Sequence, residues 1–178
     1  MNAVFFAHDS IVDAHADARL CLRCGAGAAL RLLARLDYRV FVLCLTGTPA
    51  PARDAHMGAQ GAAERLDDLL FREHVELSGY YADALHEGAA DMALARADEG
   101  ASQTLALRAA HEHGVALASS WLVGSTLRAI EAGNRAGCRS VLIDDGKEQA
   151  WRLGKHRVPH HVAPDVYAAA ILIANAAD

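Results

Sequence analysis

Polar side chains that could do chemistry gather just after the first apolar run of the chain. Residues 3–7 read Ala-Val-Phe-Phe-Ala, and His8 and Asp9 follow at once, with Asp13 and His15 close behind. A carboxylate and an imidazole can transfer protons, and these four side chains together could bind a metal ion through nitrogen and oxygen. The alternative is that they are solvated loop residues, with Asp9 capping nearby backbone amides.

The four cysteines are too few for a disulfide framework in a chain of 178 residues. Cys21 and Cys24 form a single Cys-x-x-Cys pair, a spacing found in redox and metal sites, but no second pair accompanies it. An ordinary loop position before the first predicted helix is the alternative for both. Cys44 and Cys138 lie in or beside apolar runs, and we expect them to be buried thiols without chemistry.

Three further groups of polar residues invite interpretation. The basic stretch 155–161, Lys-His-Arg-Val-Pro-His-His, is interpreted as a solvated surface, with an anion site as the alternative. Residues 144–146, Asp-Asp-Gly, end an apolar run, where a turn is the simple interpretation and a ligand pocket the other. His111 and His113 are two residues apart on a predicted helix, so they face different sides and form no ligand pair.

Apolar runs that alternate with helical patterns must position these side chains. Short runs of consecutive apolar residues are typical of strands buried on both faces of a parallel sheet, whose carboxyl ends face the ligand site. The expected strands are residues 3–7, 39–45, 77–82, 120–124, 140–143 and 160–162. The expected helices are residues 25–36, 53–74, 102–113, 125–137 and 164–174. Residues 10–24 are predicted to form a loop, and residues 83–100 a surface excursion. Ser125 is predicted to cap its helix, and Pro164 to open the last one.

Length and charge restrict the class of protein. The chain is long enough for one domain over residues 1–178 with a full-sized core. The net charge of −5 gives no electrostatic reason to expect nucleic acid or an anionic membrane as a partner. The start lacks the basic segment of a leader, and no apolar stretch approaches the roughly 20 residues of a membrane span. We therefore expect a cytoplasmic protein.

Six stretches of the chain form an ordered series of patterns. They are residues 5–11 (FFAHDSI), 41–48 (FVLCLTGT), 75–82 (VELSGYYA), 123–129 (VGSTLRA), 131–137 (EAGNRAG) and 141–147 (VLIDDGK). In the same order they resemble F-L-D-x-D-G-T, V-V-x-T-N-Q-S-G, V-D-G-I-Y-Y-C-P-H, V-G-D-x-x-x-D, A-A-x-A-G and V-L-V-x-T-G-K. These are motifs of the haloacid dehalogenase (HAD) superfamily, in its cap-less branch of heptose-bisphosphate and histidinol-phosphate phosphatases. The resemblance covers nearly the whole chain. It implies a Rossmann-like α/β fold with three layers, α/β/α, a central parallel sheet and no large cap domain.

The resemblance also shows where the superfamily's catalytic carboxylates would fall. The first Asp of the opening motif, which attacks phosphorus, corresponds to Ala7, whereas the second, a general acid, is retained as Asp9. The magnesium-binding Asp and its partner one turn later correspond to Ser125 and Ala129. Glu131 cannot replace them, because six residues place it roughly 240° around the helix from the first of these. The resemblance thus implies that the magnesium site is lost.

The groups that would hold phosphate and zinc are also replaced. The phosphoryl-binding hydroxyl falls at Cys44, although Thr46 could substitute, and the phosphate-binding Lys falls at about Gly100. No lysine precedes Lys147. A structural zinc common in the branch has no cysteine ligands here, and His86 alone does not make a zinc site. No cofactor is therefore expected.

Two classes of function follow from the resemblance. Losing a catalytic nucleophile costs on the order of 10⁴- to 10⁶-fold, so we expect an inactive, HAD-like pseudophosphatase. Its role would be binding, regulation or scaffolding, with a protein partner or a sugar phosphate, in bacterial surface-sugar (heptose) metabolism. The alternative is an active hydrolase of a phosphorylated sugar, similar to heptose bisphosphate phosphatases, with a relocated site. Such a site could use His8, Asp9 and His15.

Overall fold

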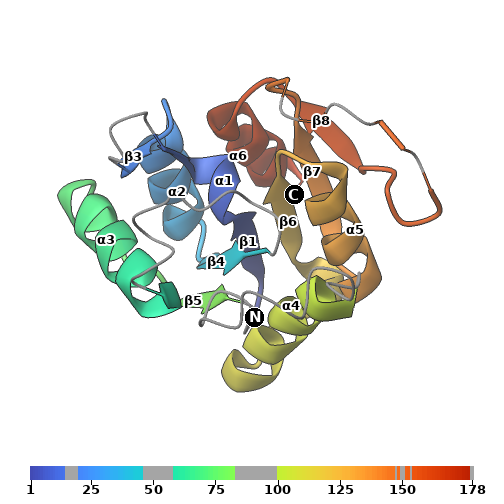
Figure 1. The fold of residues 1–178 in the computed structure, drawn as a ribbon, viewed down its shortest axis with the longest axis horizontal. Coiled ribbons are helices and arrows are strands. Elements are labelled where there is room, and N and C mark those ends of the chain that lie inside the picture. The colour runs from blue at the N-terminus through green and yellow to red at the C-terminus, as the bar shows by residue number, and fades with distance from the viewer. Residues whose placement is uncertain are drawn as a thin grey trace.

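A six-stranded parallel sheet forms the centre of the protein (Figure 1). The computed structural model describes residues 1–14, 20–45, 58–82, 100–146, 148, 151–152 and 154–176. The strand order is β5-β4-β1-β6-β7-β8. The strands are β1 (Ala3–Ala7), β4 (Arg39–Cys44), β5 (Gly79–Ala82), β6 (Trp121–Gly124), β7 (Arg139–Ile143) and β8 (His161–Ala163). The sequence predicted all six strands, to within two residues at each end.

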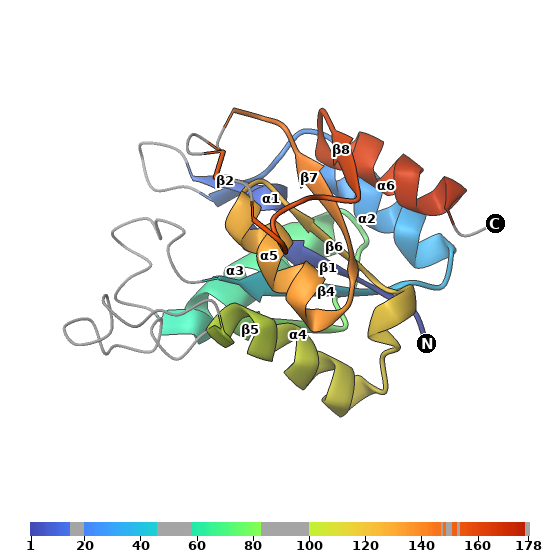
Figure 2. The ribbon, with the colours of Figure 1, turned by 90° about the vertical axis from the view of Figure 1, so that its right-hand side faces the viewer.

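Helices cover both faces of this sheet. They are α2 (Ala26–Arg35), α3 (Gly58–Arg72), α4 (Gly100–His113), α5 (Leu127–Ala136) and α6 (Val166–Asn175). Val4 and Phe6 of β1 point into a core with α2, α3 and α6, whereas Phe5 and Ala7 point into a second core with α4 and α5. Figure 2 shows α2 and α6 side by side on one face. The predicted three-layer, Rossmann-like α/β/α architecture is confirmed.

The prediction of an irregular loop over residues 10–24 is wrong. A short helix, α1 (His8–Ile11), follows β1 directly, and β2 (Val12–Ala14) pairs antiparallel with β3 (Leu20–Leu22). Val12 lies opposite Leu22, so the apolar ends of the two strands meet. Strands of three residues are too short to show a period of two in the sequence.

Helix ends differ in detail from the predictions. Thr126, not Ser125, caps α5, because its Oγ1 accepts a hydrogen bond from the Ala129 amide at 3.3 Å. Gly137 ends that helix in the left-handed conformation, with φ at 89°. α4 begins at Gly100, two residues before the predicted start. Pro164 precedes α6 as expected, but Asp165 is its N-cap.

Two of the predicted segments lie partly outside the residues that the structure describes. Residues 53–57 of the predicted second helix lie outside the described residues, as do residues 83–99 of the predicted excursion. Within the described part of the chain, every helix is too short or too polar to cross a bilayer.

Candidate functional site

The carboxyl ends of β1 and β6 meet at one edge of the sheet, here called the carboxyl edge. Ala7, the last residue of β1, is buried, and α1 starts at the next residue. The buried Ser10 hydroxyl donates to the carbonyl oxygen of Ala7 at 2.6 Å and lies 3.5 Å from that of Val123 in β6. Ser10 therefore ties the two strand ends together, a role that the sequence did not indicate.

Position 125 is buried directly after β6. A hydroxymethyl group stands there, and Ser125 Oγ accepts a hydrogen bond from Nη1 of Arg23 at 3.3 Å. Ala129, which the resemblance places at the second of the two implied magnesium positions, is buried in the first turn of α5. A Cβ added at Gly124 would lie only 2.4 Å from Cβ of Ala129, so glycine permits α5 to approach the strand end.

Arg23 contacts several polar side chains at the carboxyl edge. Besides Ser125, its guanidinium contacts two carboxylates: Nη2 lies 2.6 Å from Asp145 Oδ2, and Nε lies 3.4 Å from Asp13 Oδ2. Its side chain is 18% exposed, and that of Asp145 is 9% exposed. We call Arg23, Asp13, Ser125 and Asp145 the Arg23 cluster. Of the two interpretations of residues 144–146, the structure places Asp145 in this cluster, while Gly146 makes a turn with φ at 79°.

A carboxylate of the chain also occupies the N-terminus of α5. Glu148 Oε2 accepts a hydrogen bond from the backbone amide of Leu127 at 2.7 Å. The first amides of a helix favour negative charge and are a common site for anions. At this amide the negative charge comes from the protein itself.

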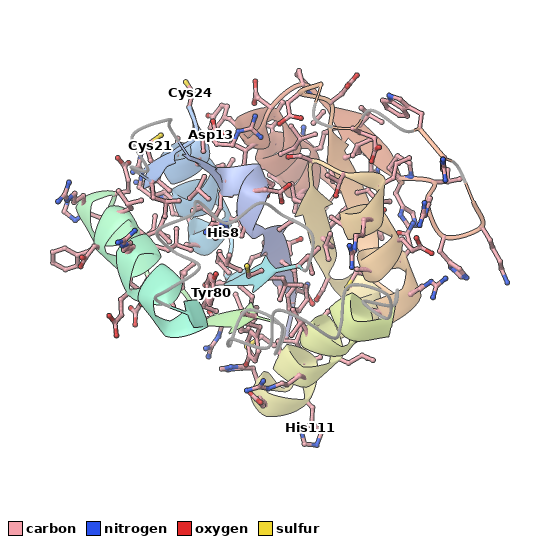
Figure 3. All side chains as sticks on the ribbon, in the orientation of Figure 1. His8, Asp13, Cys21, Cys24, Tyr80 and His111 are labelled. Carbon is pink, nitrogen blue, oxygen red and sulfur yellow. The ribbon has the colours of Figure 1, made fainter. Side chains whose placement is uncertain are left out.

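The remaining predicted site residues are dispersed. His8 and Asp9 lie in α1, half-buried, and the His8 ring meets Tyr80 edge-on with centroids 6.1 Å apart (Figure 3). Cys44 is buried at the end of β4, and Gly100 is the first residue of α4. Among the described residues, no group of three or more His, Cys, Asp or Glu is arranged to hold a metal ion. Thr46, His15 and His86 lie outside the described residues.

The four cysteines are free thiols. Cys24 is exposed, whereas the Cys21 thiol is half-buried and lies 3.5 Å from the carbonyl oxygen of Asp13. Cys44 and Cys138 are buried as predicted, and burial raises the pKa of the Cys138 thiol to about 12. The metal or redox interpretation of Cys21 and Cys24 stays a prediction.

The basic stretch near the C-terminus is largely solvated, as predicted, because Lys155, His160 and His161 are exposed, whereas Arg157 is half-buried against α5. The buried carboxylate of Glu131 forms ion pairs with Arg135, at 2.8 Å, and with Arg157. Asn134 Nδ2 donates to the carbonyl oxygens of residues 156 and 158, at 2.8 and 2.9 Å. We call Glu131, Arg135 and Arg157 the Glu131 cluster. As predicted, this carboxylate takes no part in the polar contacts around Ser125.

The two histidines of α4 face different sides, as predicted. His111 is exposed (Figure 3), and His113 Nε2 lies 3.0 Å from the hydroxyl of Tyr81. That hydroxyl donates to Glu112 at 2.6 Å. Burial first, and then this hydrogen bond, raise the pKa of Tyr81 to about 12. These residues belong to the packing of α4 on β5, away from the Arg23 cluster.

Comparison with known proteins agrees with this architecture. Residues 100–169 match the family described as HAD-hydrolase-like. D,D-heptose 1,7-bisphosphate phosphatase from B. bronchiseptica, complexed with magnesium and phosphate, superposes with a TM-score of 0.73 at 19% identity, covering 99% of each chain. The corresponding phosphatase from Burkholderia thailandensis gives 0.68 at 18% identity, covering 98% of this chain and 99% of that one. A search of curated proteins finds no match.

A third solved structure of similar fold is also a phosphatase. The cobalt-bound deoxy-D-mannose-octulosonate 8-phosphate phosphatase from Haemophilus influenzae superposes with a TM-score of 0.62 at 13% identity, covering 99% of this chain and 88% of that one. At these identities the solved structures show the fold. The resemblance to the haloacid dehalogenase superfamily is thus confirmed, in fold over nearly the whole chain and in sequence pattern over residues 100–169.

Proposed function

We propose that this protein is a pseudophosphatase, a HAD-like protein that binds, regulates or scaffolds and does not hydrolyse phosphate esters. The observation that carries the proposal is Ala7. By the resemblance it stands at the nucleophile's position, and in the structure it is a buried methyl group at the end of the central strand. A methyl group cannot attack phosphorus, so the covalent step of the superfamily has no nucleophile at this position.

The residues at the implied magnesium positions do not fit that ion. Magnesium requires near-octahedral oxygen ligands and is usually held by one or two carboxylates. Ala7 offers no side-chain oxygen, and the hydroxyl of Ser125 already accepts a hydrogen bond from a cation, the guanidinium of Arg23. We therefore propose that no cofactor is needed, and no step of a mechanism is assigned to a metal.

The positive charges that the superfamily places on the phosphoryl group, a lysine and a magnesium ion, also have no counterpart by the resemblance, and their loss should lower the rate of hydrolysis strongly. Positioned positive charge on the transferring phosphoryl group is commonly the largest single contribution to such catalysis. A remaining general acid, Asp9, contributes about 10²- to 10⁴-fold, and only to a reaction that another group has started. Its retention in the first turn of α1 is compatible with binding alone.

The proposed ligand is a phosphorylated sugar, with a protein partner as the alternative. Two solved structures of similar fold are phosphatases of D,D-heptose 1,7-bisphosphate, which supports a role in surface-sugar metabolism by analogy. The net charge of −5 supports neither nucleic acid nor an anionic membrane as a partner. A cytoplasmic location is proposed with this role.

A second candidate is an active hydrolase with a relocated site. Asp9 favours it, because this carboxylate is retained beside the end of β1, with Asp13 four residues further along the chain. In such an enzyme, a water molecule activated by Asp9 would replace the missing nucleophile. The ion pair between Asp13 and Arg23 leaves that second carboxylate engaged elsewhere.

Phosphate release separates the two candidates. The purified protein is incubated with D,D-heptose 1,7-bisphosphate, and separately with p-nitrophenyl phosphate, with and without magnesium. We expect release at the rate of a buffer blank and no difference between the protein and its Asp9→Asn variant. Release that depends on protein concentration and disappears in Asp9→Asn would refute the pseudophosphatase and establish the relocated site.

A further inference from the structure

We propose that the guanidinium of Arg23 is the built-in cation of the carboxyl edge. In this proposal it holds the oxygens of Asp13, Asp145 and Ser125 together where the superfamily resemblance implies a divalent ion. The inference rests on the proposed function only in the assignment of Ser125 to the metal position. It goes beyond that function because it names the group that replaces the ion, the guanidinium, and the side-chain oxygens that this group contacts.

The contacts use three different nitrogens of one guanidinium. Nη1 donates to the hydroxyl oxygen of Ser125 at 3.3 Å, Nη2 lies 2.6 Å from the Asp145 carboxylate, and Nε lies 3.4 Å from that of Asp13. These oxygens come from the ends of β6 and β7 and from the β2–β3 hairpin, three segments far apart in the sequence. A planar guanidinium with five N–H donors suits several oxygen partners better than an ammonium does.

The backbone on both sides of Arg23 fixes where its side chain starts. The Arg23 amide donates to the carbonyl oxygen of Ile11, and its own carbonyl accepts from the amide of Ala26, both at 2.9 Å. Gly25 adopts a left-handed φ of 80° between them, and a Cβ added there would lie 3.1 Å from Cβ of Tyr167 in α6. The turn is therefore held against α1, α2 and α6, so the fold fixes the point from which the Arg23 side chain extends.

Charge explains why the edge requires a cation. Asp145 is 9% exposed, and a carboxylate this far from water is costly unless it is paired. Without Arg23, two carboxylates and a hydroxyl lose a cationic partner that they share, and these groups are hard oxygen ligands of the kind that magnesium and manganese accept. Removing the guanidinium should therefore create a divalent-cation site that the native protein does not have.

Thermal unfolding in metal-free buffer, with added MgCl₂ or MnCl₂, tests this prediction. We expect no metal-dependent change in Tm for the native protein. Arg23→Ala should lower Tm by roughly 5 °C, and millimolar divalent cation should recover at least half of that loss, because a ligand that binds only the folded state stabilises it. Arg23→Gln, closer in shape, serves the same purpose if Arg23→Ala does not fold.

Two control variants make the result specific. Arg31→Ala removes a guanidinium that pairs with the half-exposed Glu73 at 2.6 Å; it should change Tm little and give no response to metal. The double variant Arg23→Ala/Asp145→Asn should lose the recovery. A rise in Tm of the native protein with magnesium, a recovery that persists in the double variant, or an Arg23→Ala protein that metal does not stabilise would each overturn the proposal. Phosphate release by the native protein would refute the pseudophosphatase and leave these shifts in Tm unaffected.

Discussion

The Arg23 cluster and the Glu131 cluster are opposite arrangements of the same charges. In the first, one guanidinium lies among two carboxylates and a hydroxyl at the carboxyl edge. In the second, one buried carboxylate lies between two guanidiniums, on α5 and on the segment that follows β7. The first joins segments that meet where α/β folds bind ligands, and the second fastens a connecting segment to a helix.

The difference teaches that location, and not the chemistry of an ion pair, distinguishes a candidate site from a structural fastening. Removing either central charge takes one opposite charge away from its partners and should destabilise the fold, most of all where the central group is itself buried, as Glu131 is. Only the Arg23 cluster, once opened, leaves oxygen ligands at the carboxyl edge. The predictions below test how far the two clusters differ, from the largest expected effect to the smallest.

The largest effect is expected from Glu131→Gln. This carboxylate is 8% exposed and forms ion pairs with two arginines. Replacing it with the neutral glutamine should therefore lower the free energy of unfolding by about 3 kcal/mol, which corresponds to roughly 6–12 °C in Tm. Divalent cations should not restore any of this loss, in contrast to Arg23→Ala. Urea denaturation with and without magnesium measures both quantities.

Glu73→Gln is the matched control, because that carboxylate is 41% exposed and pairs with a single arginine, Arg31. We expect a loss below about 1 kcal/mol. Equal losses for the two glutamates, or recovery of Glu131→Gln by magnesium, would remove the distinction between the two clusters.

A smaller loss is expected where α5 approaches the end of β6. In Gly124→Ala, the new methyl would lie 2.4 Å from Cβ of Ala129 and 3.6 Å from that of Ala7. Overpacking of this kind costs roughly 1–3 kcal/mol. Gly154→Ala, where a Cβ meets nothing within 4 Å, should stay close to the native stability in the same urea titration. Equal midpoints for both variants would show that the close approach is not required.

The smallest effect involves neither cluster. Burial raises the pKa of the Cys138 thiol to about 12 from an ordinary 9.0, and that of Tyr81 to about 12 from 10.0. In the unfolded chain both groups ionise earlier, so their stabilising contribution is complete below about pH 9 and is lost as the pH rises towards 12.

We expect the free energy of unfolding to fall by roughly 1 kcal/mol between about pH 8 and about pH 10. Cys138→Ala should flatten that slope, while the same change at the exposed Cys24 should leave it unaltered. Urea midpoints at the two pH values provide the measurement. A slope that is the same in all three proteins would show that the thiol at position 138 does not titrate late.

Sequence reasoning could predict the sheet because each strand is a short apolar run between polar residues. Phe5 and Phe41, for example, lie in such runs, and they stack in the core with ring centroids 5.3 Å apart. The β2–β3 hairpin was not predictable in this way, because three-residue strands such as Val12–Ala14 carry too little pattern. The capping residue of α5 was misplaced by one position, since adjacent Ser and Thr are both good caps.

The candidate site, like the fold, could be predicted from the sequence only in part. The sequence could place Ala7 and Ser125 at strand ends, because the first ends an apolar run and the second directly follows one. Arg23 could not be placed there, because its partner Ser125 is 102 residues away and nothing local marks the contact. The contact of Arg157 with Glu131 was missed for the same reason, since the two residues are 26 apart in the sequence. Long-range ion pairs leave no periodic signal in one sequence.

A crystal structure of the protein grown in magnesium chloride and phosphate tests the central claim most directly. We expect the guanidinium of Arg23 within hydrogen-bonding distance of Ser125 and Asp145, with no metal ion bound to either. A magnesium ion held by Asp9, Asp13 or Asp145, with phosphate beside it and Arg23 displaced, would contradict the claim that this edge has replaced its metal with its own arginine.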